Sequence, residues 1–425
     1  RENRKAMSGA ESCELLVRDL CSGWRAWEEV WREPILYAVS HLIGLSNEPG
    51  IQHLARVLVD DRPDGCDWHH LAIAAEILAE HGNRAHYRSG GDLWGRVHQA
   101  LENRLIERSL RPTERDRIGG ALAALGDERP GVGVRRTRGG KASREDAEVP
   151  DILWSEPIEP PPEGFTMGAT DSDPSAWDQE KPAFLCRLIP VPYRMAVFPV
   201  TVAQFRAFVR AGGYSPKGRQ WWTEEGWAWR EEESLSGPGC EDYPPPYRRA
   251  SVPMTGVSFF EAVAFCRWLR DLGGRCGEAL LSGVRLPTEM EWELAARGPD
   301  ERKVGRRNPW GYQKQDLADR CNVTDSRIGH PSPVGLFGTH GRAWCGAEDM
   351  AGNVWEWTCS EWTPNYHDFR GFAAEKGGGS RVLRGGSFYV SPWSVHASIR
   401  DHDLPDVRNG DVGFRLVSSP FFPTA

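Results

Sequence analysis

Apolar residues recur at helical spacing through most of the first 125 residues. Leu71, Ile77 and Leu78 belong to one such period in the segment DWHHLAIAAEILAEHGN, and further periods run from 93 to 109 and from 113 to 125. We therefore expect an all-α region over residues 1–125. Because the sequence begins at Arg1 without a methionine, this region is expected to be the C-terminal part of a longer chain.

Three histidines lie in or beside this helical pattern, at His69, His70 and His81. Adjacent histidines on a helix point about 100° apart, and no spacing of carboxylates and histidines completes a metal site. The pattern favours ordinary helix surface or core over a metal centre.

Between 126 and 150 the chain becomes rich in glycine, proline and charge, with RRTRGGKASRED at its centre. Such a composition is typical of a linker. The basic residues of this segment could contact phosphate, but solvated linker charge is the simpler interpretation.

From 151 onward the helical signals are short and clearly bounded. Three capping boxes, in which a hydroxyl residue is followed three positions later by a glutamate or glutamine, predict three helix starts. They are Thr201 with Gln204, Ser258 with Glu261, and Thr288 with Glu291. Glycines at 212–213, 273–274 and 298 are expected to end these helices. Few helices among many loops predict an α+β domain over residues 151–425.

A tryptophan- and proline-rich insertion runs from 220 to 249 and contains Trp221, Trp222, Trp227 and Trp229. Such aromatic side chains can stack on sugars or bases, but packing of a long loop onto the domain is the favoured interpretation.

The stretch 381–417 is the most informative part of the chain. Short strands are predicted at Arg381–Arg384 and Gly413–Val417, whereas residues 389–411 between them follow no helical or strand period. A loop of this length inside a compact domain is usually functional or disordered. Because both ends are fixed in strands, we favour function.

Composition and charge exclude several classes of protein. A net charge of −8 and a pI near 5.9 argue against a general nucleic-acid binder. No apolar run is long enough to span a bilayer. The 10 cysteines are irregularly spaced without a CxxC pair, as expected of a reduced, cytoplasmic protein.

Four separated motifs resemble those of the formylglycine-generating-enzyme (sulfatase-modifying factor) family, a branch of the C-type lectin fold. They are RLPTEMEWE at 285–293, DMAGNVWEW at 349–357, RVLRGGS at 381–387 and GFRLV at 413–417. The resemblance implies a C-type-lectin-like domain over 151–425. Enzymes of that family carry two redox cysteines after GGS, where this chain has Val390 and Val395. Valine forms no thiolate, so thiol chemistry at these positions is absent.

The same stretch also resembles the variable region of diversity-generating retroelement proteins, whose domains end in GGS, a loop and GFR. Codons diversified in that family yield no Lys, Glu, Gln, Met or Trp. Between Phe388 and Val412 only Trp393 departs from this rule, as a different template codon would allow. The resemblance implies a non-catalytic protein that binds a macromolecular ligand, taken to be a protein, through an exposed and contiguous surface. That surface would consist of Tyr389, Val390, Ser391, Trp393, Ser394, His396, Ser398, Ile399, Asp401, Asp403, Leu404, Val407 and Asp411. The alternative is that this stretch is a degraded enzyme loop whose composition is accidental.

The first resemblance also implies a structural Ca²⁺ site, since carboxylates and turn carbonyls suit this cation. Its ligands would be the side chains of Asp349 and Glu356 with the carbonyls of Gly352 and Val354. A tight turn without metal is the alternative. No redox cofactor is expected.

The main prediction is therefore ligand recognition without catalysis. One rival is an oxidoreductase, either formylglycine-generating or an iron-dependent sulfoxide synthase of the same fold. The other is a sensor module of a larger signalling ATPase, since LGDERPGVG before a lectin-type module resembles proteins with an upstream ATPase or protease region.

Overall fold

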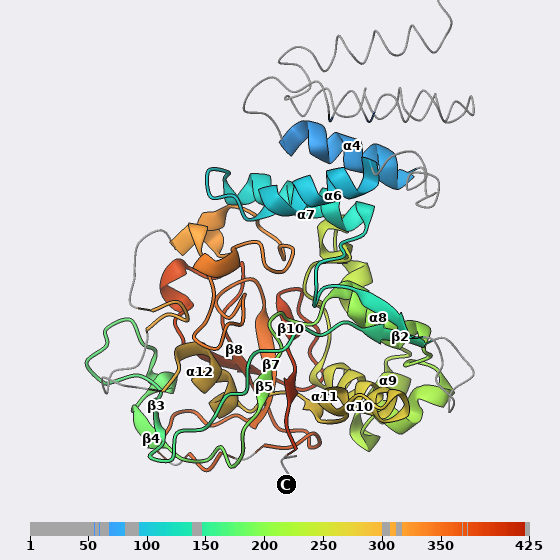
Figure 1. Cartoon of the computed structure of the whole chain (residues 1–425). Coiled ribbons are helices and arrows are strands. Elements are labelled where there is room, and N and C mark those ends of the chain that lie inside the picture. The colour runs from blue at the N-terminus through green and yellow to red at the C-terminus, as the bar shows by residue number, and fades with distance from the viewer. Residues whose placement is uncertain are drawn as a thin grey trace, which may run out of the picture. The chain divides into compact units, whose positions relative to one another are not determined.

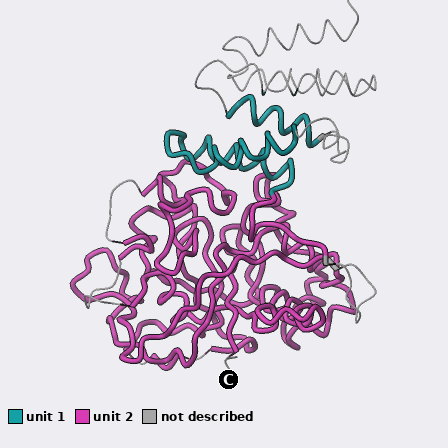
Figure 2. Tube along the Cα trace, viewed as in Figure 1, with its two compact units in different colours: residues 1–127 teal, residues 128–425 magenta. Residues whose placement is uncertain are grey.

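The computed structural model describes residues 55, 59, 68–80, 93–137, 147–299, 307–311, 317–367, 369–371 and 373–420. The chain divides into two compact units, residues 1–127 and 128–425, coloured separately in Figure 2. His81 and residues 1–54 of the expected all-α region lie outside the described residues.

The described part of the first unit is helical, as predicted (Figure 1). Its helices are α4 (Trp68–Glu80), α6 (Leu93–Leu105) and α7 (Pro112–Leu125). His70 is buried, and burial lowers the pKa of its neighbour His69 to about 4. An imidazole kept neutral by its apolar surroundings agrees with the helix-core interpretation of these histidines.

In the second unit the predicted capping boxes are present. The helices are α8 (Val202–Arg210), α9 (Glu224–Glu232), α10 (Phe259–Cys276), α11 (Ala279–Ser282) and α12 (Glu289–Arg297). The hydroxyls of Thr201, Ser258 and Thr288 each accept a hydrogen bond from the amide three residues on, which begins α8, α10 and α12.

One predicted helix end is wrong. Helix α10 does not stop at Gly273–Gly274 but continues to Cys276, and Gly277 ends it with a φ of +73°. Gly273 serves packing instead, because a Cβ there would lie 2.5 Å from the Cβ of Leu281. The glycine allows α11 to fold back closely against α10.

Four small sheets complete the second unit. Its strands are β1 (Val134–Thr137), β2 (Ala147–Pro150), β3 (Phe165–Met167), β4 (Phe184–Cys186), β5 (Arg194–Met195), β6 (Val284–Arg285), β7 (Trp355–Glu361), β8 (Arg381–Arg384), β9 (Arg400–Asp403), β10 (Val412–Phe414) and β11 (Val417–Ser418). The main sheet has the order β10-β7-β8-β9, with β10 parallel to β7 and the other pairs antiparallel. A second sheet has the order β5-β11-β6, and β1-β2 and β3-β4 are hairpins.

Two segments differ from the predictions made for them. Strands β1 and β2 pair with each other inside the segment expected to be a linker, and Val149 is fully buried in the core of the second unit. The strand predicted at 413–417 is divided, because β10 joins the main sheet and β11 joins the second one. The buried Arg415 lies between them, so this short run connects the two sheets.

The core of the second unit lies between helices α8 and α10 and the main sheet. Phe205, Phe265 and Phe414 pack ring against ring, with centroids 5.5–6.2 Å apart. Trp222 of the insertion is buried in the same cluster and donates its indole N–H to the carbonyl of Gly213 at 2.8 Å. Trp221 and Trp227 are buried as well, which confirms packing as the role of this insertion.

Candidate functional site

The loop at residues 387–411 leaves the main sheet through two glycines with left-handed backbone. Gly385 has φ +97° and Gly386 has φ +78°, a region that side chains rarely adopt. A Cβ on Gly386 would lie 2.8 Å from a methyl carbon of Val395. The two ends of the loop are joined by Ser387, whose hydroxyl donates to Asp411 at 2.8 Å.

Glu180 holds the first half of the loop through buried hydrogen bonds. One of its carboxylate oxygens is hydrogen-bonded to Nε2 of His396 at 2.5 Å and accepts from the hydroxyl of Ser398 at 2.8 Å. All three side chains are buried. Burial raises the pKa of Glu180, but the hydrogen bond and charge of His396 outweigh burial, so this pKa lies below its ordinary value.

Glu289 of α12 anchors the middle of the loop. Nη2 of Arg400 donates to Oε1 of Glu289 at 3.2 Å, and Nε of Arg400 lies 3.2 Å from Oε2 as an ion pair. The hydroxyl of Tyr366 donates to Oε2 at 3.2 Å. One turn further along α12, Glu293 accepts from Arg384 of β8 at 2.5 Å. These pairs are fully buried, so breaking one would leave an uncompensated charge.

Glu261, the capping-box glutamate of α10, anchors the last part of the loop. Arg408 donates to its carboxylate at 3.1 Å and to the carbonyl of Gly237 at 2.7 Å. The hydroxyl of Tyr214 donates to the same carboxylate oxygen. Burial raises the pKa of Glu261 although Arg408 opposes this effect. The three glutamates come from segments more than 100 residues before the loop residues they bind.

Between these anchors the loop presents large apolar side chains to solvent. Tyr389 is 71% exposed, Trp393 59% and Leu404 52%. Tyr389 and Trp393 precede a continuous buried run at residues 395–400, and Leu404 follows it. The geometry is that of a fixed loop displaying a few large groups.

The expectation of one fully exposed surface is wrong for three residues. His396 and Ser398 turn inward to Glu180, and Ile399 is fully buried in the core. The others are exposed or half-buried: Tyr389, Val390, Ser391, Trp393, Ser394, Asp401, Asp403, Leu404, Val407 and Asp411. The structure thus brings an outer and an inner set of side chains into one loop. Sequence reasoning missed the anchors Glu180 and Glu289, and the only available signal was the capping box at Glu261.

The two valines that replace thiols take part in a small hydrophobic contact. Val395 is fully buried with Val323, Ala351 and Cys321, and Val390 packs against the same cluster. Burial raises the pKa of the Cys321 thiol far above its ordinary value, which opposes formation of a reactive thiolate.

The two carboxylates expected to bind Ca²⁺ have protein partners. Both oxygens of Glu356 accept hydrogen bonds from Arg415, at 2.6 and 2.7 Å, and one also accepts from the indole of Trp292 at 2.6 Å. Asp349 accepts from the amide of Gly335 at 2.9 Å, and burial raises its pKa to about 7. The ion pair with Arg415 competes with a cation for the Glu356 carboxylate.

Beyond this turn, the part of the chain that the structure describes contains no group of three or more His, Cys, Asp or Glu side chains arranged to hold a metal ion. The Ca²⁺ site at Asp349, Gly352, Val354 and Glu356 stays a prediction. Arg415 already supplies one positive charge to the Glu356 carboxylate.

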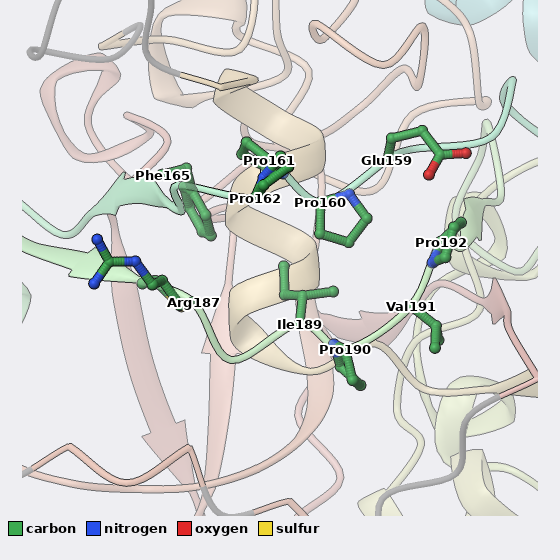
Figure 3. A pocket seen from close by; sticks show the side chains of 11 residues that line it. Glu159, Pro160, Pro161, Pro162, Phe165, Arg187, Ile189, Pro190, Val191 and Pro192 are labelled. Atoms are coloured by element: carbon green, nitrogen blue, oxygen red, sulfur yellow. The ribbon is translucent and has the colours of Figure 1, made fainter.

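A cavity of about 290 Å³ lies apart from the loop residues. Figure 3 shows two proline-containing segments, 159–162 and 189–192, along opposite sides of it. The 13 residues of the predicted recognition surface are absent from its lining, so it is not the predicted site.

Comparison with known proteins identifies the family. The model of the sulfatase-modifying factor enzyme 1-like domain matches residues 160–420, which is more than half of the chain. The chain belongs to this family. The match confirms the predicted fold class, an α+β sulfatase-modifying-factor domain with a helical region before it.

Curated relatives in this family include enzymes. The chain is 36% identical over 276 residues to hercynine oxygenase of Mycolicibacterium thermoresistibile, covering 59% of this chain and 56% of that protein. It is 31% identical over 301 residues to formylglycine-generating enzyme of Streptomyces coelicolor, covering 60% of this chain and 86% of that one. The chain thus spans little more than half the length of the first relative.

Among solved structures, Treponema denticola variable protein 1 matches with a TM-score of 0.43 and 18% identity, covering 68% of this chain and 99% of that one.

These relatives overturn two predictions. The prediction that the protein is not an enzyme is wrong, because the relatives of this sulfatase-modifying-factor domain are named as an oxygenase and as a formylglycine-generating enzyme. The prediction that no redox cofactor is involved is wrong for the same reason. These predictions relied on the resemblance to diversity-generating retroelement proteins and on the valines at 390 and 395, which exclude a thiol at two positions and nothing more. The described residues contain no helix with the length and apolar character needed to cross a bilayer.

Proposed function

We propose that residues 128–425 recognise the substrate of an oxidoreductase on the exposed side of the 387–411 loop. Family membership and the names of the relatives support an enzyme-related role. The observation that carries the proposal is the display of Tyr389, Trp393 and Leu404 at the surface of a loop fixed by buried glutamates. Exposed apolar groups on a rigid support are typical of binding surfaces.

The valines decide which relative is the better guide. Because Val390 and Val395 cannot supply thiolates, the formylglycine-generating reaction lacks its two cysteines on this loop. An oxygen-dependent reaction therefore requires a redox group from outside residues 387–411. We favour a small-molecule substrate of the kind that hercynine oxygenase is named for, with this loop binding and orienting it.

The test uses the whole chain and two candidate ligands, hercynine and a cysteine-containing peptide. Binding is followed by tryptophan fluorescence, and turnover by oxygen uptake with Fe(II) or Cu(I) added. Leu404→Ala is expected to weaken binding several-fold, since truncating a binding leucine removes roughly 1–2 kcal/mol of apolar contact. Leu185→Ala is the matched control, because Leu185 is similarly exposed, at 49%, but lies on β4.

Hercynine binding that Leu404→Ala weakens and Leu185→Ala does not is the expected result. Failure of both ligands to bind, or equal effects of the two leucine variants, would refute a substrate-recognition role for the loop.

A second candidate is recognition of a macromolecule by the same loop as a diversified region. The observation that favours it is the absence of Lys, Glu, Gln and Met from residues 389–411, together with the exposed side chains of this segment. A near-copy of the coding segment beside a reverse transcriptase, differing from it at adenines, is the observation that tests this role. The protein nature of the ligand, the upstream ATPase or protease region and the cytoplasmic location stay predictions.

A further inference from the structure

A row of aromatic rings extends the loop surface onto a separate segment of the chain. Tyr243 and Tyr247 are stacked with ring centroids 5.1 Å apart and an interplanar angle of 20°. Tyr247 meets Phe388 edge-on at 6.1 Å, and Phe388 lies 5.1 Å from Tyr389. We call Tyr243, Tyr247, Phe388 and Tyr389 the aromatic row. At its other end the ring of Tyr243 rests on the loop backbone, where a Cβ on Gly410 would lie 2.5 Å from it.

The row is accessible rather than part of the core. Tyr243 and Tyr247 are half-buried, and Tyr389 is largely exposed, whereas Phe388 is buried beneath them. Side chains in the 243–247 segment thus add two aromatic faces to the surface already proposed for recognition. Nothing in the 389–411 sequence indicated these two tyrosines.

The arginines of the loop do not neutralise its surface. Arg400 and Arg408 both turn inward, the first to Glu289 and the second to Glu261. Their charges are therefore used in buried pairs. Arg248, which directly follows the 243–247 segment, pairs with Glu241 at 3.7 Å.

The carboxylates of the loop remain on the outside. Asp411 accepts from the hydroxyl of Ser387, and Asp403 accepts from the amide of Asn409 at 3.0 Å, so both have neutral donors. Asp406 is exposed, and Asp401 accepts from the backbone amide of His402 at 2.8 Å, with Nδ1 of the same residue 3.6 Å away.

These carboxylates act on one another and on the row. Burial and the charges of Asp401 and Asp406 raise the pKa of Asp403. The pKa values of Tyr243 and Tyr247 are raised mainly by burial and also by Asp411, which places negative potential beside their rings.

We propose that the aromatic row and the loop aspartates form a docking site for a basic polypeptide segment. Guanidinium and ammonium groups lie favourably over tyrosine faces and pair with carboxylates, so one arginine or lysine gains from both. The chain's net charge of −8 attracts such a partner from a distance. This inference rests on the proposed role of the 387–411 loop in recognition. It adds a basic polypeptide as a second class of ligand beside the small-molecule substrate.

The experiment uses the full chain and a fluorescent synthetic peptide that alternates arginine with glycine, with anisotropy as the readout. A peptide of equal length with glutamate in place of arginine is the reference. The arginine peptide is expected to bind and to lose affinity as salt is added, because exposed charges are screened. Tyr247→Leu and Asp411→Asn are each expected to weaken binding about fivefold, as loss of one cation–π or ion-pair contact does.

Asp171→Asn is the matched control, since Asp171 is an exposed carboxylate on a different loop and should not change the affinity. Thermal unfolding of each variant checks that the fold is intact. Equal binding of the glutamate peptide, no binding of either peptide, or an equal loss with Asp171→Asn would overturn the inference. A single-stranded oligonucleotide binding more tightly than the arginine peptide would overturn it as well.

The leucine pair described above separates the two proposals. If the arginine peptide fails but Leu404→Ala still weakens hercynine binding selectively, the partner class is wrong and the recognition role stands. If both experiments fail, both proposals fall.

Discussion

The ion pair between Glu356 and Arg415 provides the sharpest test of how this domain is held together. Glu356 lies on β7 and Arg415 between β10 and β11, so the pair links the main sheet to the second one. Both side chains are buried, and the carboxylate accepts two hydrogen bonds from the guanidinium and one from Trp292. We predict that Glu356→Gln destabilises the domain strongly and that calcium does not reverse the loss.

The magnitude follows from what the substitution leaves behind. Glutamine has nearly the same side-chain volume as glutamate but only one acceptor oxygen. Its NH₂ group would therefore face at least one of the three donors, which are Nε and Nη2 of Arg415 and the indole N–H of Trp292. Arg415 retains the carbonyls of Ala196, Val197 and Glu348 as acceptors, but it loses its counter-charge. Removing one partner of a buried pair costs about 3–5 kcal/mol.

The assay is urea unfolding of wild type, Glu356→Gln, Arg415→Met and the double variant, followed by tryptophan fluorescence. The double variant should lose less than the sum of the single losses, because residues in direct contact are coupled. A loss below about 1 kcal/mol for Glu356→Gln, or strict additivity, would contradict the pairing. If added calcium raised the unfolding free energy of the wild-type protein and a chelator removed this gain, the turn would bind calcium.

Three further substitutions test other buried groups. Because burial raises the pKa of Asp349 to about 7 from an ordinary 3.8, its contribution is favourable below pH 3.8 and is lost as pH rises through 7. The stability of Asp349→Asn relative to wild type, measured by urea unfolding from pH 4 to 8, should therefore grow by up to about 4 kcal/mol; a constant difference would refute this. Glu180 has a lowered pKa, so the stability it provides is present above its ordinary 4.5 and is lost as pH falls below that value. Glu180→Gln should remove this acid-dependent part from a plot of stability against pH. Gly386→Ala should lower the melting temperature, because φ +78° is strained for alanine and its Cβ would meet Val395; an unchanged temperature would show that the turn can relax.

Helices α8, α10 and α12 of the second unit were predictable because their signals are local, whereas α9 and α11 were not predicted. A capping box satisfies backbone donors within four residues, so Thr201, Ser258 and Thr288 specify helix starts whatever surrounds them. The failed stop at Gly273 shows the limit of such reasoning. A glycine placed for close packing against Leu281 looks the same in sequence as one placed to end a helix.

Strand β9 could not be predicted, because its sequence Arg400-Asp401-His402-Asp403 has no apolar alternation. It is a strand because β8 pairs with it, and both the buried Arg400 and the exposed His402 have a distant partner. Arg400 reaches Glu289, and His402 stacks on Trp362 with ring centroids 4.1 Å apart. A polar side chain can be buried wherever a hydrogen-bonding partner is buried opposite it. Such a partner is distant in sequence, so the residues around the strand do not reveal it.

The same argument explains why the recognition surface was only partly predictable. Composition marks residues 389–411 as a unit but does not divide them into outer and inner positions. That division is made by Glu180, Glu289 and Glu261, each of which binds a basic or hydroxyl side chain of the loop. A buried carboxylate requires a partner, so each glutamate holds at least one loop side chain inward, and residues 395–400 are buried as one run. Variation at Tyr389, Trp393 or Leu404 leaves these pairs intact, whereas a change at His396 or Arg400 strands a buried charge. The loop can therefore change what it recognises only at positions between its anchors.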